Sequence, residues 1–78
     1  MPEEIQQLIK TKISDPDTLK AIFEGNPTPF ELDGVQAVNF WFYGQEIDLY
    51  LIEPIAFKHV EIGAFFDSFD DLLQEITL

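Results

Sequence analysis

The fold is decided by residues 35–52, which read VQAVNFWFYGQEIDLYLI. Apolar side chains recur at every second position on both sides of Gly44, and this period is typical of strands that bury one face. Gly44 and Gln45 form a glycine-first pair that suits a two-residue type II′ turn. We therefore predict a β-hairpin made of residues 35–43 and 46–52.

The predicted turn determines which residues lie opposite each other. It sets residue 43 against residue 46, so that one face of the hairpin is wholly apolar and is the expected buried face. The apolar cross-strand pairs are Phe42–Ile47, Phe40–Leu49 and Val38–Leu51. The other face carries Asn39, Trp41, Tyr43, Glu46, Asp48 and Tyr50. On this register Trp41 lies beside Asp48, and Tyr43 lies beside Glu46.

Two helices are predicted before the hairpin. The apolar stripe of residues 3–13 has helical spacing and consists of Ile5, Leu8, Ile9 and Ile13. Ser14 is placed to cap a second helix, with Pro16 in its first turn and Asp17 completing a capping box. This second helix is expected to run to about Phe23 and to end at Gly25.

The flanking segments extend the sheet and close the domain. Asp33-Gly34 predicts a tight hairpin that pairs residues 30–32 with residues 35–37, on the face that carries Trp41. Residues 57–66 are predicted as a further strand, and Ser68 as the cap of a final helix. The chain is therefore expected to be one α+β domain over residues 1–78. It comprises two N-terminal helices, a three- to four-stranded antiparallel sheet of hairpins, and one C-terminal helix.

Composition excludes several classes of function. The 78 residues include fifteen acids, four lysines and no arginine, for a net charge of −11, and 46% are hydrophobic, which argues against disorder. The absence of cysteine excludes disulfides, thiolate metal sites and cysteine nucleophiles. A small protein with this much negative charge repels nucleic acid and anionic lipid but attracts basic protein surfaces. We expect no direct nucleic-acid binding and a basic protein partner.

The termini and hydropathy predict a cytoplasmic protein. The N-terminal residues, MPEE, lack the basic-then-apolar order of a secretory signal. No stretch approaches the roughly twenty apolar residues that span a bilayer, so no membrane association is expected.

The sequence offers no candidate set of residues for catalysis or for metal binding. His59 is the only histidine, and with Glu61 it offers two metal ligands where a tight transition-metal site needs at least three. Ser14 and Ser68 are explained as helix caps and stand in no Gly-x-Ser-x-Gly motif. We therefore expect no enzyme activity, no catalytic residue, no metal and no cofactor.

The acidic residues are unevenly distributed along the chain. Residues 27–78 carry a net charge of −9 against −2 for residues 1–26, so the acidic excess falls on the hairpins and the last helix. Two groups of residues in this part of the chain are candidates for binding a partner. The aromatic and carboxylate face of the hairpin suits a lysine- or arginine-bearing partner, unless the first two helices cover it as a second core. The acidic, apolar run at 65–73 either docks into a partner groove or packs as an ordinary capped helix. The predicted partner-binding residues are Trp41, Tyr43, Glu46, Asp48, Tyr50, Glu61, Asp67, Asp70 and Asp71.

The sequence therefore predicts a non-enzymatic acidic protein that docks on a basic surface of a partner macromolecule. An inhibitor that occludes a nucleic-acid-binding groove, as a nucleic-acid mimic does, and a toxin-neutralising immunity protein are its sharper forms. The alternative is a small structural or adaptor subunit that homo-oligomerises or joins a larger assembly through aromatic surface. On its own the chain is expected to be a monomer or a weak dimer.

Overall fold

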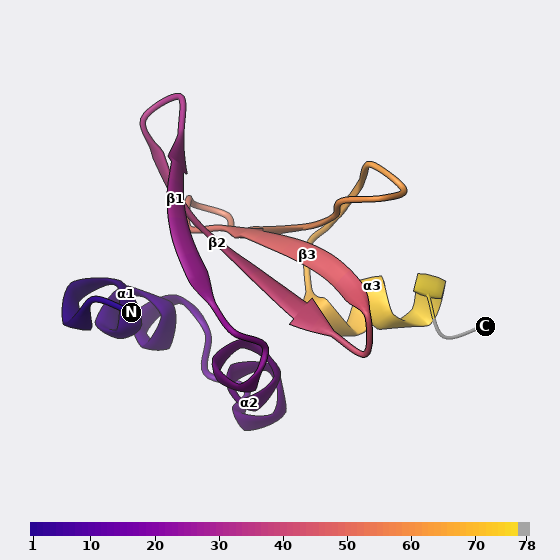
Figure 1. The fold of residues 1–78 in the computed structure, drawn as a ribbon, viewed down its shortest axis with the longest axis horizontal. Coiled ribbons are helices and arrows are strands. Elements are labelled where there is room, and N and C mark those ends of the chain that lie inside the picture. The colour runs from indigo at the N-terminus through magenta and orange to yellow at the C-terminus, as the bar shows by residue number, and fades with distance from the viewer. Residues whose placement is uncertain (77–78) are drawn as a thin grey trace.

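The structure, a computed structural model, describes residues 1–76 and has the predicted α+β order of elements (Figure 1). In chain order they are α1 (Glu3–Lys12), α2 (Pro16–Glu24), β1 (Thr28–Leu32), β2 (Val35–Phe42), β3 (Gln45–Tyr50), β4 (Ala56–His59), β5 (Ala64–Phe66) and α3 (Phe69–Ile76). The five strands form one antiparallel sheet in the order β1-β2-β3-β4-β5. The fold class is confirmed, with one strand more than the upper limit predicted.

The additional strand arises because residues 57–66 do not form a single strand. They fold as β4 and β5 around a turn at residues 60–63, in which Gly63 adopts a φ of 81° and its N–H donates to the His59 carbonyl. The apolar alternation runs on through Val60 and Ile62, although both lie in the turn. The apolar alternation therefore predicted one continuous strand, whereas Gly63 can adopt the positive φ that the turn requires.

The turn between β2 and β3 lies one residue earlier than predicted. Tyr43 and Gly44 form it with φ values of 48° and 77°, and two successive positive φ angles are typical of a type I′ turn, whose twist matches that of the strands. The resulting pairs are Phe42–Gln45, Phe40–Ile47 and Val38–Leu49. Every partner is thus displaced by two residues, a shift that leaves each strand residue on its predicted face. The buried face is confirmed, and the predicted partners are wrong.

The first hairpin is as predicted. Asp33 and Gly34 form its turn with φ values of 51° and 80°, Leu32 lies opposite Val35, and Phe30 lies opposite Ala37. Phe30 and Leu32 therefore share a face of the sheet with Trp41, as the sequence indicated.

One face of the sheet carries the hydrophobic core. All three helices lie on this side (Figure 1), and side chains from each of them enter one buried cluster with the strands. The buried members are Ile9, Ile13, Ile22, Val38, Phe40, Ile47, Leu49, Leu51, Phe57, Phe69 and Leu72. We call this the covered face. None of the helices in residues 1–76 is both long enough and apolar enough to cross a membrane.

The helix caps correct one expectation and confirm two. Asp15, not Ser14, caps α2: its Oδ2 accepts from the N–H and the hydroxyl of Thr18 at 3.0 and 2.6 Å. The reason is Pro16, which holds the preceding residue in the extended conformation that an N-cap needs. Ser68 caps α3 by accepting from the Asp71 N–H at 3.1 Å, and α2 ends at Gly25 as predicted.

Gly25 also brings α2 against the sheet. Its carbonyl accepts from the Trp41 N–H at 2.9 Å, and an added Cβ would lie 2.5 Å from the Trp41 carbonyl oxygen. A larger residue would have to push this helix end away from β2. Glycine is therefore required here for the close approach of two backbones.

Candidate functional site: the open face of the sheet

None of the helices within residues 1–76 lies over the second face of the sheet (Figure 1). The strand registers place on it Thr28, Phe30, Leu32, Val35, Ala37, Asn39, Trp41, Glu46, Asp48, Tyr50, Ala56, Lys58 and Phe65. We call this the open face. Trp41 is 48% exposed and Phe65 is 61% exposed. The interpretation in which helices bury these aromatic side chains as a second core is therefore wrong.

A row of aromatic rings crosses the open face from β1 to β5. The Phe30 and Tyr50 ring centroids lie 6.1 Å apart in an edge-to-face arrangement, and Tyr50 and Phe65 are separated by the same distance. Ala37 is fully buried although no helix lies above it. The open face is therefore partly apolar, and its rings are fixed relative to one another by contact.

Two carboxylates lie next to this aromatic row and are held together by one amide. Asn39 Nδ2 donates to Glu46 Oε2 at 2.9 Å and to Asp48 Oδ1 at 2.8 Å. Asn39 and Asp48 are direct cross-strand partners, which explains the contact. We call Glu46 and Asp48 the carboxylate pair. Both side chains are half-buried, so their charges are screened by water less than those of fully exposed acids.

No cation of the described chain lies within 4 Å of the carboxylate pair. Within residues 1–76 the one ion pair closer than 4 Å joins Lys12 to Glu53. Lys58 lies opposite Asp48 on β4, but its Nζ sits 5.6 Å from the centre of the Phe65 ring. Burial, and secondarily the charge of Asp48, raise the pKa of Tyr50 above its ordinary value. The negative charge of Asp48 thus acts on Tyr50, the middle ring of the aromatic row.

The structure brings four of the nine predicted binding residues together and separates the other five. Trp41, Glu46, Asp48 and Tyr50 share the open face. Tyr43 does not: it lies in the β2–β3 turn, is 90% exposed, and its ring packs edge-to-face on Phe42. Because Tyr43 is a turn residue, the alternation of the strand does not determine its direction.

Glu61 is exposed in the β4–β5 turn and is not on a strand face with His59. His59 is 2% exposed, its Nδ1 accepts from the Ile62 N–H at 3.2 Å, and its Nε2 lies against the Gln45 side-chain oxygen. Both ring nitrogens are therefore engaged in holding the turn to β3. Among residues 1–76, no three histidine, aspartate or glutamate side chains gather as metal ligands.

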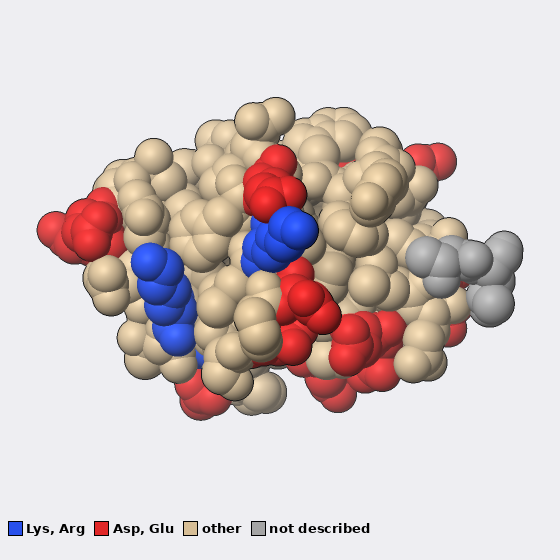
Figure 2. All heavy atoms as spheres, turned by 90° about the horizontal axis from the view of Figure 1, so that it is seen from below, with Lys and Arg blue, Asp and Glu red and all other residues tan. Residues whose placement is uncertain are grey.

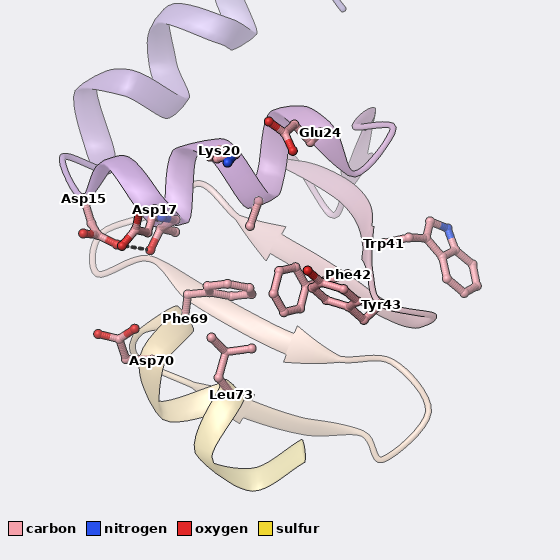
Figure 3. A pocket seen from close by; sticks show the side chains of 12 residues that line it. Asp15, Asp17, Lys20, Glu24, Trp41, Phe42, Tyr43, Phe69, Asp70 and Leu73 are labelled. Carbon is pink, nitrogen blue, oxygen red and sulfur yellow. Dashed lines mark hydrogen bonds between the residues drawn. The ribbon is translucent and has the colours of Figure 1, made fainter. Parts of the chain in front are cut away.

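The three aspartates at the start of α3, Asp67, Asp70 and Asp71, are exposed and lie away from the open face. Asp70 lines a groove of about 500 Å³ between α2 and α3, which we call the helix groove (Figure 3). The groove also contains the carboxylates of Asp15, Asp17 and Glu24, while Phe42 and Phe69 lie between the two helices. Strand and helix periodicity could not indicate it, because it depends on how α2 and α3 pack.

The helix groove contains a lysine as well as carboxylates. Lys20 is among its lining residues, and the carboxylate of Asp15 is engaged by Thr18. Trp41 also lines this groove, although its indole ring points away from Phe42 and Phe69 (Figure 3). Figure 2 shows the helix-covered side of the molecule, where acidic side chains gather in several places with lysines beside some of them.

Sequence reasoning placed Asn39 on the correct face but did not include it among the binding residues. Its position directly opposite Asp48 emerges only from the correct register. Phe30 was likewise placed on this face without being included. Lys58 and Phe65 were missed because their places on the open face depend on where β4 and β5 begin and end.

Comparison with known proteins assigns no family. No protein-family model matches the chain, and no curated protein and no solved structure matches it significantly. A function has to be inferred from the chemistry of the surface.

Proposed function

We propose that this chain is a non-enzymatic binding protein that docks on a basic surface of a partner protein through its open face. The observation that carries the proposal is the carboxylate pair, which Asn39 holds on an uncovered face and with which no lysine of the described chain forms an ion pair. The charge of −11 would accelerate encounter with a basic surface. Trp41 and Tyr50 would then supply the aromatic anchors that contribute strongly to binding energy.

In its sharper form, the basic surface is a nucleic-acid-binding groove in a cytoplasmic partner, and the chain inhibits the partner by occupying it. Glu46 and Asp48 are same-face neighbours on one strand. Asn39 brings one oxygen of each to less than two hydrogen-bond lengths apart, while their expected backbone spacing is about 6.6–7 Å. That is roughly twice the axial rise per phosphate in one DNA strand. The cationic side chains of a phosphate-binding surface would therefore have to shift in order to contact both carboxylates. An immunity protein that neutralises a toxin would use the same chemistry.

The test is affinity capture of partner proteins from cell lysate with matched variants. Glu46→Gln combined with Asp48→Asn removes two charges from the open face, and Asp17→Asn combined with Asp70→Asn removes two from the helix groove. We expect the wild type to capture basic proteins at low salt and to release them at high salt. The open-face variant should lose this capture and the groove variant should keep it. Equal capture by the two variants would contradict the proposed surface.

A second candidate function is self-association as a structural or adaptor subunit. It is favoured by Leu32 and Phe65, which are 50% and 61% exposed on the open face, and by the outer edge of β1, which pairs with no other strand in the described chain. A dimer built on apolar contacts should persist or tighten as salt rises, because salt screens the repulsion between two acidic copies. Sedimentation of the protein alone at low and high salt distinguishes the two functions.

A further inference from the structure

We infer that the open face is built to take an arginine side chain of its partner, with the guanidinium on the carboxylate pair between Trp41 and Tyr50. This inference rests on the proposed function and names the chemistry that the partner must present. Any equally basic surface satisfies the proposed function, whereas the inference requires arginine in preference to lysine.

The first argument is the geometry of the carboxylate pair. One nitrogen, Asn39 Nδ2, contacts an oxygen of each carboxylate, so these two oxygens lie less than two hydrogen-bond lengths apart. The second oxygen of each carboxylate, Glu46 Oε1 and Asp48 Oδ2, has no hydrogen-bond partner within residues 1–76. A planar guanidinium carries five N–H donors in a fixed fork and can serve two acceptors at once, whereas a lysine ammonium is a compact, strongly hydrated point charge.

The second argument is the position of the aromatic rings. Trp41 is the cross-strand partner of Glu46, and Tyr50 follows Asp48 on the same face of β3. Each end of the pair therefore has an aromatic neighbour. A guanidinium stacks on aromatic faces in addition to bonding carboxylates, and it is less strongly hydrated than an ammonium. The exposed indole of Trp41 is accessible for such a contact.

The third argument is charge complementarity. The chain contains no arginine, and Lys58, the one lysine on the open face, lies over the Phe65 ring. Two half-buried like charges share a neutral amide and have no cation within 4 Å among the described residues, an arrangement that an external cation would stabilise. The partner is the source of that cation.

The test uses calorimetric titration of the full chain with two synthetic peptides that are identical except for three arginines in one and three lysines in the other. We expect the arginine peptide to bind the wild type about tenfold more tightly. Asn39→Thr keeps both charges and a strand-forming residue, but its single hydroxyl donor cannot bridge both carboxylates. This variant should bring the two affinities within about twofold of each other while retaining weak, salt-sensitive binding.

Two charge variants separate the inference from the proposed function. Binding of both peptides should be lost with Glu46→Gln plus Asp48→Asn and kept, with the same arginine preference, by Asp17→Asn plus Asp70→Asn. Equal affinity of the two peptides for the wild type would overturn the arginine inference and leave the proposed function standing. Arginine preference that survives in the open-face variant would overturn both. The wild-type comparison decides the inference even if the Asn39 variant does not fold, which circular dichroism would show.

Discussion

The two faces of this sheet are made from alternate residues of the same strands, yet they have opposite roles. On the covered face, Phe40 and Leu49 are fully buried and Phe57 is 1% exposed. On the open face, the aromatic side chains of Trp41 and Phe65 are about half exposed or more. The difference comes from the helices, all of which pack on one side. We conclude that the covered face holds the fold together, and we propose that the open face is left for recognition.

The two acidic regions differ in a similar way. In the helix groove, Asp15 is engaged as a helix cap and Lys20 lies among the carboxylates. On the open face, neutral Asn39 bridges the carboxylate pair, and Lys58 lies opposite Asp48 without forming an ion pair with it. The number of acids in a region is therefore a weaker indicator of a cation site than the way in which its carboxylates are held together.

The largest expected effect tests the two faces with one kind of substitution. Leu49→Ala on the covered face should lower the free energy of unfolding by about 2–5 kcal/mol, because Leu49 is fully buried in the core. Leu32→Ala on the open face, where the side chain is 50% exposed, should cost less than about 1 kcal/mol. Urea unfolding measures both. Similar losses would show that the open face contributes to stability as the covered face does.

A smaller effect tests the cap of α2. Asp15→Ala should lower the free energy of unfolding by about 1 kcal/mol, since it removes the acceptor for the Thr18 N–H and hydroxyl. Ser14→Ala is the matched control and should change stability by less than about 0.5 kcal/mol, because Ser14 is exposed and does not cap the helix. Thermal or urea unfolding distinguishes them, and a larger loss for Ser14 would contradict the assignment of the cap.

The smallest expected effect is on the pKa of Tyr50, which reports the electrostatics of the open face. Asp48→Asn should lower the pKa of Tyr50, because a nearby negative charge disfavours the tyrosinate anion. The pKa should remain above the ordinary value of 10.0, since burial, the larger cause of the shift, is unchanged. Glu61→Gln, which changes an exposed turn residue, serves as the control. Ultraviolet or NMR titration provides the measurement. An unchanged Tyr50 pKa in Asp48→Asn would contradict an effect of the Asp48 charge on Tyr50.

The sequence determined the faces of the sheet better than its connections. In β2 and β3, period-2 alternation assigns each residue to a face, and this assignment survives the displaced turn because partners moved by two residues. The position of the turn could not be predicted in the same way, since Tyr43-Gly44 and Gly44-Gln45 both provide a two-residue loop containing glycine. Alternation also continued through the turn at residues 60–63, which hid the break between β4 and β5.

The candidate site was predictable where it depended on one hairpin and not where it depended on distant elements. Trp41, Glu46, Asp48 and Tyr50 were placed together because they alternate on neighbouring strands. The meeting of α2 and α3 at the helix groove has no local signal in the sequence, since helix packing is set by the whole core.

The most direct test of the central claim is an NMR titration of the isotope-labelled full chain with the arginine peptide. If the carboxylate pair binds the cation, the largest backbone amide shifts should occur in β2 and β3, at Asn39, Trp41 and Asp48. The amides around the helix groove, including those of Asp17 and Asp70, should change little. The largest shifts at the helix groove, or shifts spread evenly over all acidic regions, would contradict the account.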